Sequence, residues 1–352
     1  MRILLTTPYD LAVPGGVNRH ARDLRRALAE AGHTALLVGP ASARTADEDA
    51  DVQALGGIWV GRLNGARSRV TLDPSLAPAM GRLIRDFRPD VLHLQEPFLP
   101  TLNTAALLRV GPIPVVGTFH TYSETSRGYL WSWPWCRWVN RRLHARIAVS
   151  AAARAFATRW HPAPFTEIPN GVHLPPAAAR RPDRPPGHPI RLLFVGRADE
   201  PRKGFAVLTA ALDRLHAAHP GQFSLTCVGP ATARGEVSDQ ELSAAYAAAD
   251  VCIVPSLGGE SFGLVALEAL AHGVPVVATA IRGYAEWLGD SGAAELVPPH
   301  DAAALAEGIA RLAFDPARLA ACARHGLALA EQYAWRRLAT RVLAVYAEAG
   351  RS

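Results

Sequence analysis

Residues 190–196, IRLLFVG, decide the fold: a mostly apolar run forms a strand and a glycine ends it. The same pattern recurs at 224–229, SLTCVG, and a similar run at 251–255, VCIVP, ends at a proline. Outward from there, 2–7 (RILLTT) is another such strand, and residues 17–31 carry apolar side chains at helical spacing. Repeated strand–helix units predict parallel sheets, so the expected fold class is α/β with doubly wound sheets.

A proline-rich stretch divides the chain. At 352 residues the chain is about twice as long as a typical domain of ~150 residues, and residues 174–189 hold six prolines, too many for the interior of an element. We therefore predict a Rossmann-like domain over 1–174, a linker over 175–189 and a second Rossmann-like domain over 190–334. Ligands of such sheets bind outside the carboxyl ends of the strands, which predicts one interdomain cleft.

Composition excludes several classes of protein. With 49% hydrophobic and 19% charged residues, the chain is neither disordered nor collagen-like. No apolar run approaches the roughly 18 residues of a membrane-spanning helix, and the first residues lack the blocks of a secretory signal, so a cytoplasmic chain is expected. The four cysteines are far apart and are predicted to be reduced thiols. They are Cys136, Cys227, Cys252 and Cys322.

Charge is distributed unevenly. The net charge is +6; residues 1–180 hold 21 basic and 13 acidic side chains, and residues 181–352 hold 16 and 18. No nucleic-acid recognition motif accompanies this charge, so no nucleic-acid partner is predicted. Lys203 is the single lysine among 37 basic residues. A compact ammonium suits a tight phosphate pocket, and compositional accident is the alternative explanation.

The strongest local signal of a ligand site is GGESFGL at 258–264, which follows a strand and opens a helical run. A helix N-terminus presents unpaired N–H groups and a positive dipole end, which suit a diphosphate or a sugar oxygen. Glu260 lies at the mouth of this helix and Glu268 about two turns in. Carboxylates at this spacing are commonly a solvated face, but the small and apolar neighbours favour burial, and buried carboxylates need partners such as sugar hydroxyls.

A second signal is GRADEPRKG at 196–204, again at the end of a strand. Its glycine spacing fits neither a Walker loop nor a dinucleotide fingerprint. Arg197 and Lys203 lie six residues apart across a turn and could hold a departing diphosphate, stabilising charge that grows in the transition state. Surface salt bridging is the alternative.

Two features of the N-terminal half point to a reaction centre. Gly15 and Gly16 lie between the first strand and the first helix, where the backbone can approach a ligand, although turn chemistry explains them equally well. His120 ends a strand and could donate to or orient a reacting sugar, whereas a lone histidine is usually structural. The Asp-x-Asp patterns at 47–51 favour a solvated acidic patch over a magnesium or manganese site, so no metal site is predicted.

Half of the eight tryptophans lie in residues 131–138, next to several arginines. Indole rings with arginines are typical of a helix that sits among anionic headgroups, which predicts contact with a membrane surface. Packing of the tryptophans into the domain core is the competing explanation. The predicted membrane residues are Trp131, Trp133, Trp135, Arg137, Trp138, Arg141 and Arg142.

Taken together, these residues resemble the family 4 glycosyltransferases of the GT-B fold, in which two Rossmann-like domains face a cleft. The most specific parts of the likeness are 259–268 and 196–204. Within that family the sequence is most similar to the phosphatidylinositol mannosyltransferases. The segments that match this subgroup are Tyr9, residues 14–17, Asn64 with Gly65, Arg69, residues 118–121 and residues 168–172.

The resemblance implies roles for these residues. Arg197 and Lys203 would hold the donor diphosphate, Glu260 the sugar hydroxyls and Glu268 the ribose. The implied donor site is completed by Gly15, Gly16, Asp239, Ser261, Phe262, Gly263 and Leu264. The implied acceptor residues are Tyr9, Asn64, Arg69, Thr118 and His120. The implied catalytic residues are His120, Arg197, Lys203 and Glu260. The final helix, residues 335–352, would cross back onto the first domain.

The resemblance also implies an activity: transfer of a hexose, mannose or glucose, from a GDP- or UDP-sugar to a hydroxyl of a lipid or polyol. The anomeric configuration would be retained, with no metal and no cofactor, at the inner face of an anionic membrane. Two rivals remain, a nucleotide-sugar epimerase or hydrolase of the same fold, which consumes donor without acceptor, and a non-catalytic sugar-nucleotide-binding protein.

The sequence departs from the family pattern in three places. Residues 229–236 leave no room for a further helix and strand, which predicts a smaller second sheet. Two lysines of the subgroup are matched here by Leu242 and Thr125, which leaves the nucleotide base and the acceptor headgroup open.

Overall fold

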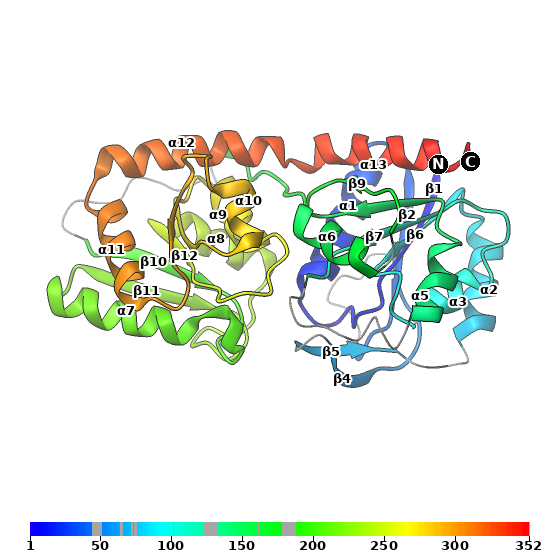
Figure 1. Ribbon diagram of the computed structural model, residues 1–352, viewed down its shortest axis with the longest axis horizontal. Coiled ribbons are helices and arrows are strands. Elements are labelled where there is room, and N and C mark those ends of the chain that lie inside the picture. Colours follow the sequence, from blue (N-terminus) through cyan, green and yellow to red (C-terminus); the bar gives the residue numbers. More distant parts are fainter. Residues whose placement is uncertain are drawn as a thin grey trace. The chain divides into compact units, whose positions relative to one another are not determined.

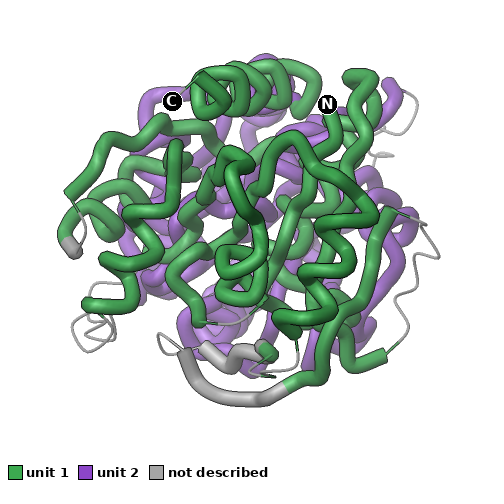
Figure 2. The backbone as a smooth tube through the Cα atoms, turned by 90° about the vertical axis from the view of Figure 1, so that its right-hand side faces the viewer, with its two compact units in different colours: residues 1–171, 335–352 green, residues 172–334 purple. Residues whose placement is uncertain are grey.

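The computed structural model describes most of the chain. The described residues are 1–43, 51–63, 66–71, 73, 76–100, 102–122, 133–160, 162–177 and 188–351; for 59–63, 66–70 and 160 only the backbone is described. The chain divides into two compact units, shown in different colours in Figure 2. Unit 1 comprises Met1–Gly171 and Trp335–Ser352, and unit 2 comprises Val172–Ala334.

The boundary between the units falls earlier in the chain than the domain boundary predicted at residue 174. Val172 forms a parallel bridge with Ala334, and its N–H donates to the Tyr333 carbonyl at 3.0 Å. Val172 also packs in the core of unit 2, so the chain enters that unit directly after Gly171. Residues 178–187 of the predicted linker lie outside the described residues.

Unit 1 is built on a parallel sheet (Figure 1). Its described strands are β1 (Arg2–Thr6), β2 (Thr34–Gly39), β3 (Val52–Ala54), β6 (Val91–Gln95), β7 (Val115–Phe119), β8 (Ala145–Ala148) and β9 (Thr166–Glu167). Their order is β3-β2-β1-β6-β7-β8-β9, so the order reverses between β1 and β6. Loops at the carboxyl ends of these two strands therefore border the usual ligand position of a doubly wound sheet. A separate antiparallel pair joins β4 (Trp59–Leu63) to β5 (Ala66–Val70).

Helices cover both faces of this sheet. They are α1 (Gly16–Glu30), α2 (Leu76–Phe87), α3 (Leu102–Leu107), α5 (Trp133–Asn140), α6 (Ala151–Trp160) and α13 (Trp335–Ala349). Buried residues of α1 and α13 share one apolar cluster with β1, whereas those of α2, α3 and α5 share a second cluster with β6. The final helix, α13, thus belongs to the core of unit 1 although all of unit 2 precedes it in the chain.

Unit 2 has a smaller parallel sheet, with five described strands against seven in unit 1. They are β10 (Ile190–Val195), β11 (Phe223–Val228), β12 (Val251–Val254), β13 (Val276–Thr279) and β14 (Ala294–Val297). Their order is β11-β10-β12-β13-β14, with the reversal between β10 and β12. After β11 the chain makes only a turn, closed by a bridge between Gly229 and Gly235, as the short 229–236 segment predicts.

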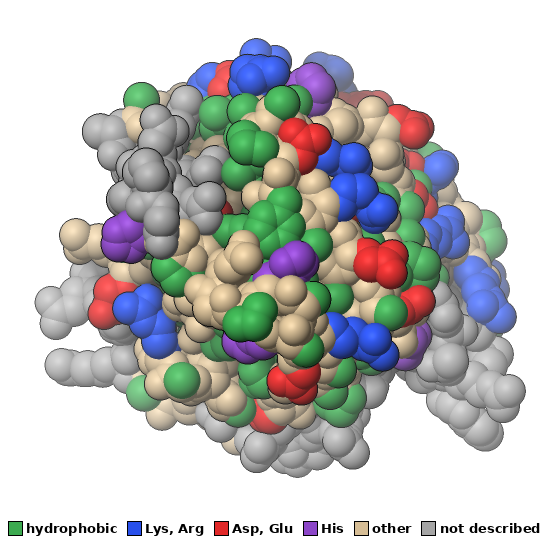
Figure 3. All heavy atoms as spheres, turned by 90° about the vertical axis from the view of Figure 1, so that its left-hand side faces the viewer, with side chains coloured by type: hydrophobic (Ala, Val, Ile, Leu, Met, Phe, Trp, Pro, Cys, Tyr) green, Lys and Arg blue, Asp and Glu red, His purple; other side chains and the backbone are tan. Residues whose placement is uncertain are grey.

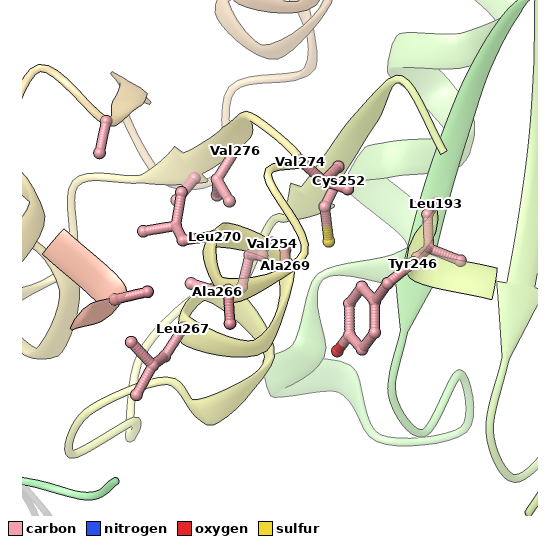
Figure 4. Packing of buried hydrophobic residues seen from close by; sticks show 14 of the residues in the cluster. Leu193, Tyr246, Cys252, Val254, Ala266, Leu267, Ala269, Leu270, Val274 and Val276 are labelled. Atoms are coloured by element: carbon pink, nitrogen blue, oxygen red, sulfur yellow. The ribbon is translucent and has the colours of Figure 1, made fainter. Parts of the chain in front are cut away.

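The helices described in unit 2 are η2 (Pro201–Lys203), α7 (Phe205–Ala218), α8 (Asp239–Ala248), α9 (Leu264–Ala271), α10 (Arg282–Leu288), α11 (Ala302–Ala313) and α12 (Pro316–Gln332). Some of them begin with a side-chain cap. Ser238 and Glu241 form a capping box at α8, and the Asp315 carboxylate caps α12. In Figure 4, Ala266, Leu267 and Leu270 of α9 pack with apolar residues of β12 and β13. All four cysteines are free, as predicted.

Charged side chains are mixed on the part of the surface that Figure 3 presents, which is the end carrying α7 and α11. Basic and acidic groups lie among hydrophobic ones there, and neither sign dominates. This agrees with the near balance of 16 basic and 18 acidic residues in the second half of the sequence.

Candidate functional site

The two motifs of unit 2 lie in contact at the carboxyl ends of neighbouring strands. Residues 196–204 follow β10, and residues 255–263 follow β12, its parallel partner. Gly204 has φ +71°, and a Cβ there would lie 1.9 Å from the Pro255 carbonyl oxygen, so only glycine allows this approach. The Leu257 N–H donates to the Arg202 carbonyl at 2.7 Å. The backbone therefore fixes the two motifs side by side.

A group of ion-paired side chains joins these loops. We call it the Glu260 cluster, and it consists of Glu200, Arg202, Lys203 and Glu260. Lys203 Nζ and Arg202 Nη1 each lie 2.5 Å from Oε1 of Glu260, and Arg202 Nε lies 2.5 Å from Oε1 of Glu200. Burial alone would raise the pKa of Glu260, but Lys203 and Arg202 lower it below its usual value. The cluster thus holds two carboxylates and two cations; carboxylates bind sugar hydroxyls, and cations bind phosphate oxygens.

The N-terminus of α9 lies beside this cluster in the chain. Gly263 caps the helix with φ +92°, and a Cβ there would lie 2.4 Å from the Tyr284 ring. The Phe262 ring stacks on Trp287 with 5.0 Å between centroids, and Trp287 Nε1 donates to the Phe262 carbonyl at 2.8 Å. Within the described part of the chain, the N–H groups of Phe262, Gly263 and Leu264 have no acceptor. These donors are available to an anion.

Glu268 is held from the neighbouring helix α8. The Tyr246 hydroxyl donates to Oε2 of Glu268 at 2.8 Å, and the Tyr246 ring stacks on His272 with 5.1 Å between centroids. The two nitrogens of His272 each lie 2.8 Å from an oxygen, Nδ1 from the Glu268 carbonyl and Nε2 from the Ser243 hydroxyl. Glu268 therefore has a fixed orientation on the first turns of α9.

The predicted donor residues Arg197 and Asp239 make no contact with the Glu260 cluster among the described interactions. The Arg197 guanidinium is 3.3 Å from Asp199 and its side chain is 40% exposed. Asp239 is the exposed first residue of α8. Arg197 therefore contacts Asp199, whereas Arg202 is the cation that shares Glu260 with Lys203.

In unit 1, His120 lies at the carboxyl end of β7 among buried polar groups. Its Nε2 is 2.7 Å from Oε1 of Gln95, and its ring meets that of His20 edge-on with 4.7 Å between centroids. Burial lowers the pKa of His120 well below its usual value, with further contributions from His20 and His93. Burial also lowers the pKa of His93 to about 3. These imidazoles are therefore neutral near pH 7.

The other predicted residues of unit 1 fall into several settings. Thr118 is buried, with its hydroxyl 2.6 Å from Nε2 of His93. Burial, and then the Glu96 charge, raise the pKa of Tyr9. Gly15 caps α1 and Gly16 begins it, as expected for either a turn or a ligand loop. Outside the described residues lie Asn64, Thr125, Trp131, residues 47–50 and the side chain of Arg69.

The tryptophan-rich segment divides into packed and exposed parts. Trp135 and Trp138 stack with 4.9 Å between centroids and pack against the core of unit 1, and Trp135 Nε1 donates to the Phe98 carbonyl at 3.0 Å. Trp133 is 45% exposed and lies under the Arg137 guanidinium. Core packing, the competing explanation, thus accounts for Trp135 and Trp138. Trp133 and the neighbouring arginines remain on the surface.

Sequence comparison decides the family. The pattern described as Glycosyltransferase Family 4 matches residues 14–174, and the pattern Glycosyl transferases group 1 matches residues 189–315. The phosphatidyl-myo-inositol mannosyltransferase of Mycolicibacterium smegmatis is 33% identical over 98% of this chain and 93% of its own length. The chain belongs to glycosyltransferase family 4. The family resemblance drawn from the sequence is thereby confirmed.

Solved structures place this glycosyltransferase in the GT-B fold. Sucrose-phosphate synthase from Thermosynechococcus elongatus matches 99% of both chains with a TM-score of 0.75 and 23% identity. The Anabaena protein HepE in complex with UDP matches 99% of this chain and all of its own, with a TM-score of 0.73 and 19% identity. The predicted architecture of two parallel α/β domains is thereby confirmed.

Several residues of the glycosyltransferase that contact the predicted site were not singled out from its sequence. Arg202 shares Glu260 with Lys203, Tyr246 holds Glu268, and Gln95 and Glu96 both bond to His120. The position of Arg202 inside the 196–204 motif could have indicated it. Among the described residues, no three His, Cys, Asp or Glu side chains gather as metal ligands, and no helix is long and apolar enough to span a bilayer.

Proposed function

We propose that this glycosyltransferase transfers a hexose, mannose or glucose, from a GDP- or UDP-sugar to a hydroxyl of a lipid or polyol, with retention of the anomeric configuration and without a metal. The observation that carries the proposal is the contact of Lys203 and Arg202 with Glu260 beside the N-terminus of α9. The name of the mycobacterial relative supports mannose and a phosphatidylinositol acceptor. The HepE complex supports a uridine nucleotide.

In this proposal the donor binds to unit 2. Lys203 and Arg202 exchange part of their contact with Glu260 for oxygens of the diphosphate, and the N–H groups at the start of α9 bind further oxygens. Glu260 then accepts hydrogen bonds from sugar hydroxyls, and Glu268 from the ribose. Arg197, which is 40% exposed, adds a third cation to the same loop.

The proposed chemistry follows from these charges. The cations stabilise negative charge that grows on the leaving diphosphate, the task that a divalent metal performs in other transferases. Glu260 is committed to two ion pairs, which disfavours its use as a nucleophile. The leaving phosphate oxygen therefore takes the proton of the acceptor hydroxyl as the glycosidic bond to phosphate breaks and the new bond forms on the same face.

The donor and acceptor can be identified directly. Purified protein is incubated with GDP-mannose, UDP-glucose or ADP-glucose, each with phosphatidylinositol vesicles, with free inositol or alone, and with EDTA or Mn²⁺. We expect one of the donors to give glycosylated product, only when an acceptor is present, and also in the presence of EDTA. NMR of the product should show the anomeric configuration of the donor.

Other outcomes separate the rivals. Donor consumed without acceptor would indicate an epimerase or hydrolase. A donor that raises the melting temperature but is never consumed would indicate a binding protein, because binding to the native state stabilises by mass action. A strict Mn²⁺ requirement, abolished by EDTA and restored by metal, would contradict metal-free transfer.

We further propose that the surface around α5 binds an anionic membrane, where a lipid acceptor would be found. Residues 133–146 include four arginines and no acidic residue. Trp133 is 45% exposed, and the Arg137 guanidinium lies 5.2 Å from the centre of its ring. An exposed indole with neighbouring guanidinium groups suits the headgroup region of a bilayer.

The membrane contact is tested by vesicle co-sedimentation of an Arg137→Gln, Arg141→Gln double variant. Because each basic residue near an anionic surface contributes about 1 kcal/mol, we expect binding to be about 30-fold weaker. A second variant, Trp133→Ala, removes the exposed indole and should also weaken binding. Its matched control is Phe314→Ala, which removes a 43%-exposed aromatic residue of unit 2 and should leave binding unchanged. Equal binding of all variants would exclude this surface.

A further inference from the structure

The geometry points to Gln95 and Glu96 as positioning residues for His120: together they fix its ring with a proton on Nε2 and leave Nδ1 to accept a hydrogen bond from a substrate hydroxyl. Gln95 acts on the imidazole and Glu96 on the backbone that carries it. The inference deepens the proposed function and rests on His120 belonging to that site. The two residues are adjacent at the end of β6, on one side of the switch point of unit 1.

The backbone of this dipeptide is tied down by Asn103. Asn103 Nδ2 donates to the carbonyls of Gln95 at 2.8 Å and of Glu96 at 3.1 Å, and Oδ1 accepts from the Thr6 hydroxyl at 2.7 Å. Glu96 has φ +49°, a conformation that non-glycine residues seldom adopt. The Glu96 N–H continues the sheet by donating to the Thr118 carbonyl at 2.8 Å. A strained turn held by a buried amide is thus built at this position.

Glu96 fixes the backbone at His120. Its Oε1 accepts from the His120 N–H at 2.8 Å and from the Thr121 hydroxyl at 2.8 Å. The residue is only 1% exposed. A buried carboxylate is costly unless such donors surround it, so this contact strongly favours one path of the chain after β7.

Gln95 fixes the ring through a chain of hydrogen bonds whose directions can be assigned. Its side chain is completely buried, with Oε1 2.7 Å from Nε2 of His120 and Nε2 3.5 Å from Nε2 of His93. An amide NH₂ only donates, and the Thr118 hydroxyl 2.6 Å from the same nitrogen can also donate, so we assign Nε2 of His93 as the unprotonated nitrogen. Nδ1 of His93 then carries the proton and donates to the Tyr346 hydroxyl, 2.6 Å away. The amide oxygen of Gln95 only accepts, so Nε2 of His120 carries the proton.

The assignment gives the two histidines opposite tautomers. Within the described residues, Nδ1 of His120 has no hydrogen-bond partner. Burial keeps the imidazole neutral by lowering the pKa of His120. A neutral ring with Nε2 occupied can therefore accept a hydrogen bond from a sugar or acceptor hydroxyl at Nδ1, and it does not act as a donor there.

The first test requires no turnover, because it observes the imidazoles of the folded protein directly. Long-range ¹H–¹⁵N NMR of the imidazoles, assigned with His93→Gln and His120→Gln variants, distinguishes the two tautomers. We expect Nε2–H for His120 and Nδ1–H for His93. Nδ1–H at His120, or rapid averaging of its two nitrogens, would overturn the inference whether or not transfer activity has been found.

The second test removes the amide oxygen of Gln95, which accepts the hydrogen bond from His120, while keeping the side-chain volume. In Gln95→Met, we expect His120 to lose its single tautomer and kcat to fall about 100-fold, as for a misplaced reacting group, with the donor KM changed less than threefold. Gln95→Glu restores an oxygen that accepts the hydrogen bond, and its kcat at pH 8 should be at least tenfold higher than that of Gln95→Met. Ser150→Ala, which deletes the hydrogen bond to the Ala153 N–H in the same unit, is the matched control and should leave kcat and the tautomer unchanged.

The outcomes separate this inference from the proposed function. Native turnover with unchanged kcat in Gln95→Met would overturn the positioning role and leave the transferase proposal intact. Absence of native turnover with every donor would contradict the transferase proposal, while the NMR result would still decide the tautomer.

Discussion

Replacing Lys203 with alanine should lower kcat/KM by about 1,000-fold, the effect of losing one preorganised group that stabilises developing negative charge. Lys203 Nζ lies 2.5 Å from Oε1 of Glu260 and its side chain is only 21% exposed, so few water molecules can reach this position to solvate the developing charge in its place. Most of the loss should fall on kcat, because the demand for positive charge is greatest as the diphosphate leaves. Steady-state kinetics with the donor identified above measures both constants.

Two control variants define what the lysine contributes. Lys203→Arg keeps the charge but offers a planar, larger group, and we expect it to recover less than a tenth of the lost activity. Arg214→Ala removes an exposed cation of the same unit and should leave kcat/KM unchanged. Because Arg202 still pairs with Glu260, the Lys203→Ala protein should melt close to the native temperature. A loss below tenfold would contradict the role of Lys203 at the diphosphate.

Replacing Trp335 with alanine should destabilise unit 1 by about 3–5 kcal/mol, the cost of deleting a large buried aromatic side chain. Trp335 is 1% exposed and contacts His20, with 5.1 Å between ring centroids. It also packs against the backbone of Gly171, where an added Cβ would lie 2.5 Å from its Cδ2. The side chain therefore fastens the start of α13 to the rest of unit 1.

The Trp335 effect is measured by urea unfolding, with hydrogen exchange read separately for each unit. We expect earlier unfolding and faster exchange in unit 1, and little change in the core of unit 2 around Leu267. Thr340→Ala alters an exposed residue of the same helix and should change the free energy of unfolding by less than about 0.5 kcal/mol. Equal destabilisation by both variants would show that α13 is held by something other than Trp335.

The sequence predicts the two sheets well because a strand ending at a glycine, as at residues 190–196, is a local pattern. The contact between the loops after β10 and β12 is less local, since β11 lies between them in the chain but pairs at the edge of the sheet. Sequence alone therefore suggests that Lys203 and Glu260 share a ligand, the strand order explains why their loops are neighbours, and the ion pair shows that the side chains touch.

Other parts of the site depend on tertiary detail that periodicity does not carry. Gln95 meets His120 from an adjacent strand, and the residues are 25 positions apart. Glu96 adopts a left-handed conformation that no residue type at this position indicates. In the tryptophan-rich segment, composition could not separate the packed Trp135 from the exposed Trp133, because that difference depends on the direction of each side chain from α5.

The placement of α13 has a consequence for how the protein is made. The first 171 residues leave the ribosome early, yet the helix that covers one face of their sheet is translated only after the whole of unit 2. Until then the nascent unit 1 presents uncovered apolar residues of its core, such as Ile3 and Leu24, to the cellular milieu. Chaperone binding during synthesis should therefore concentrate on the half of the chain that is translated first.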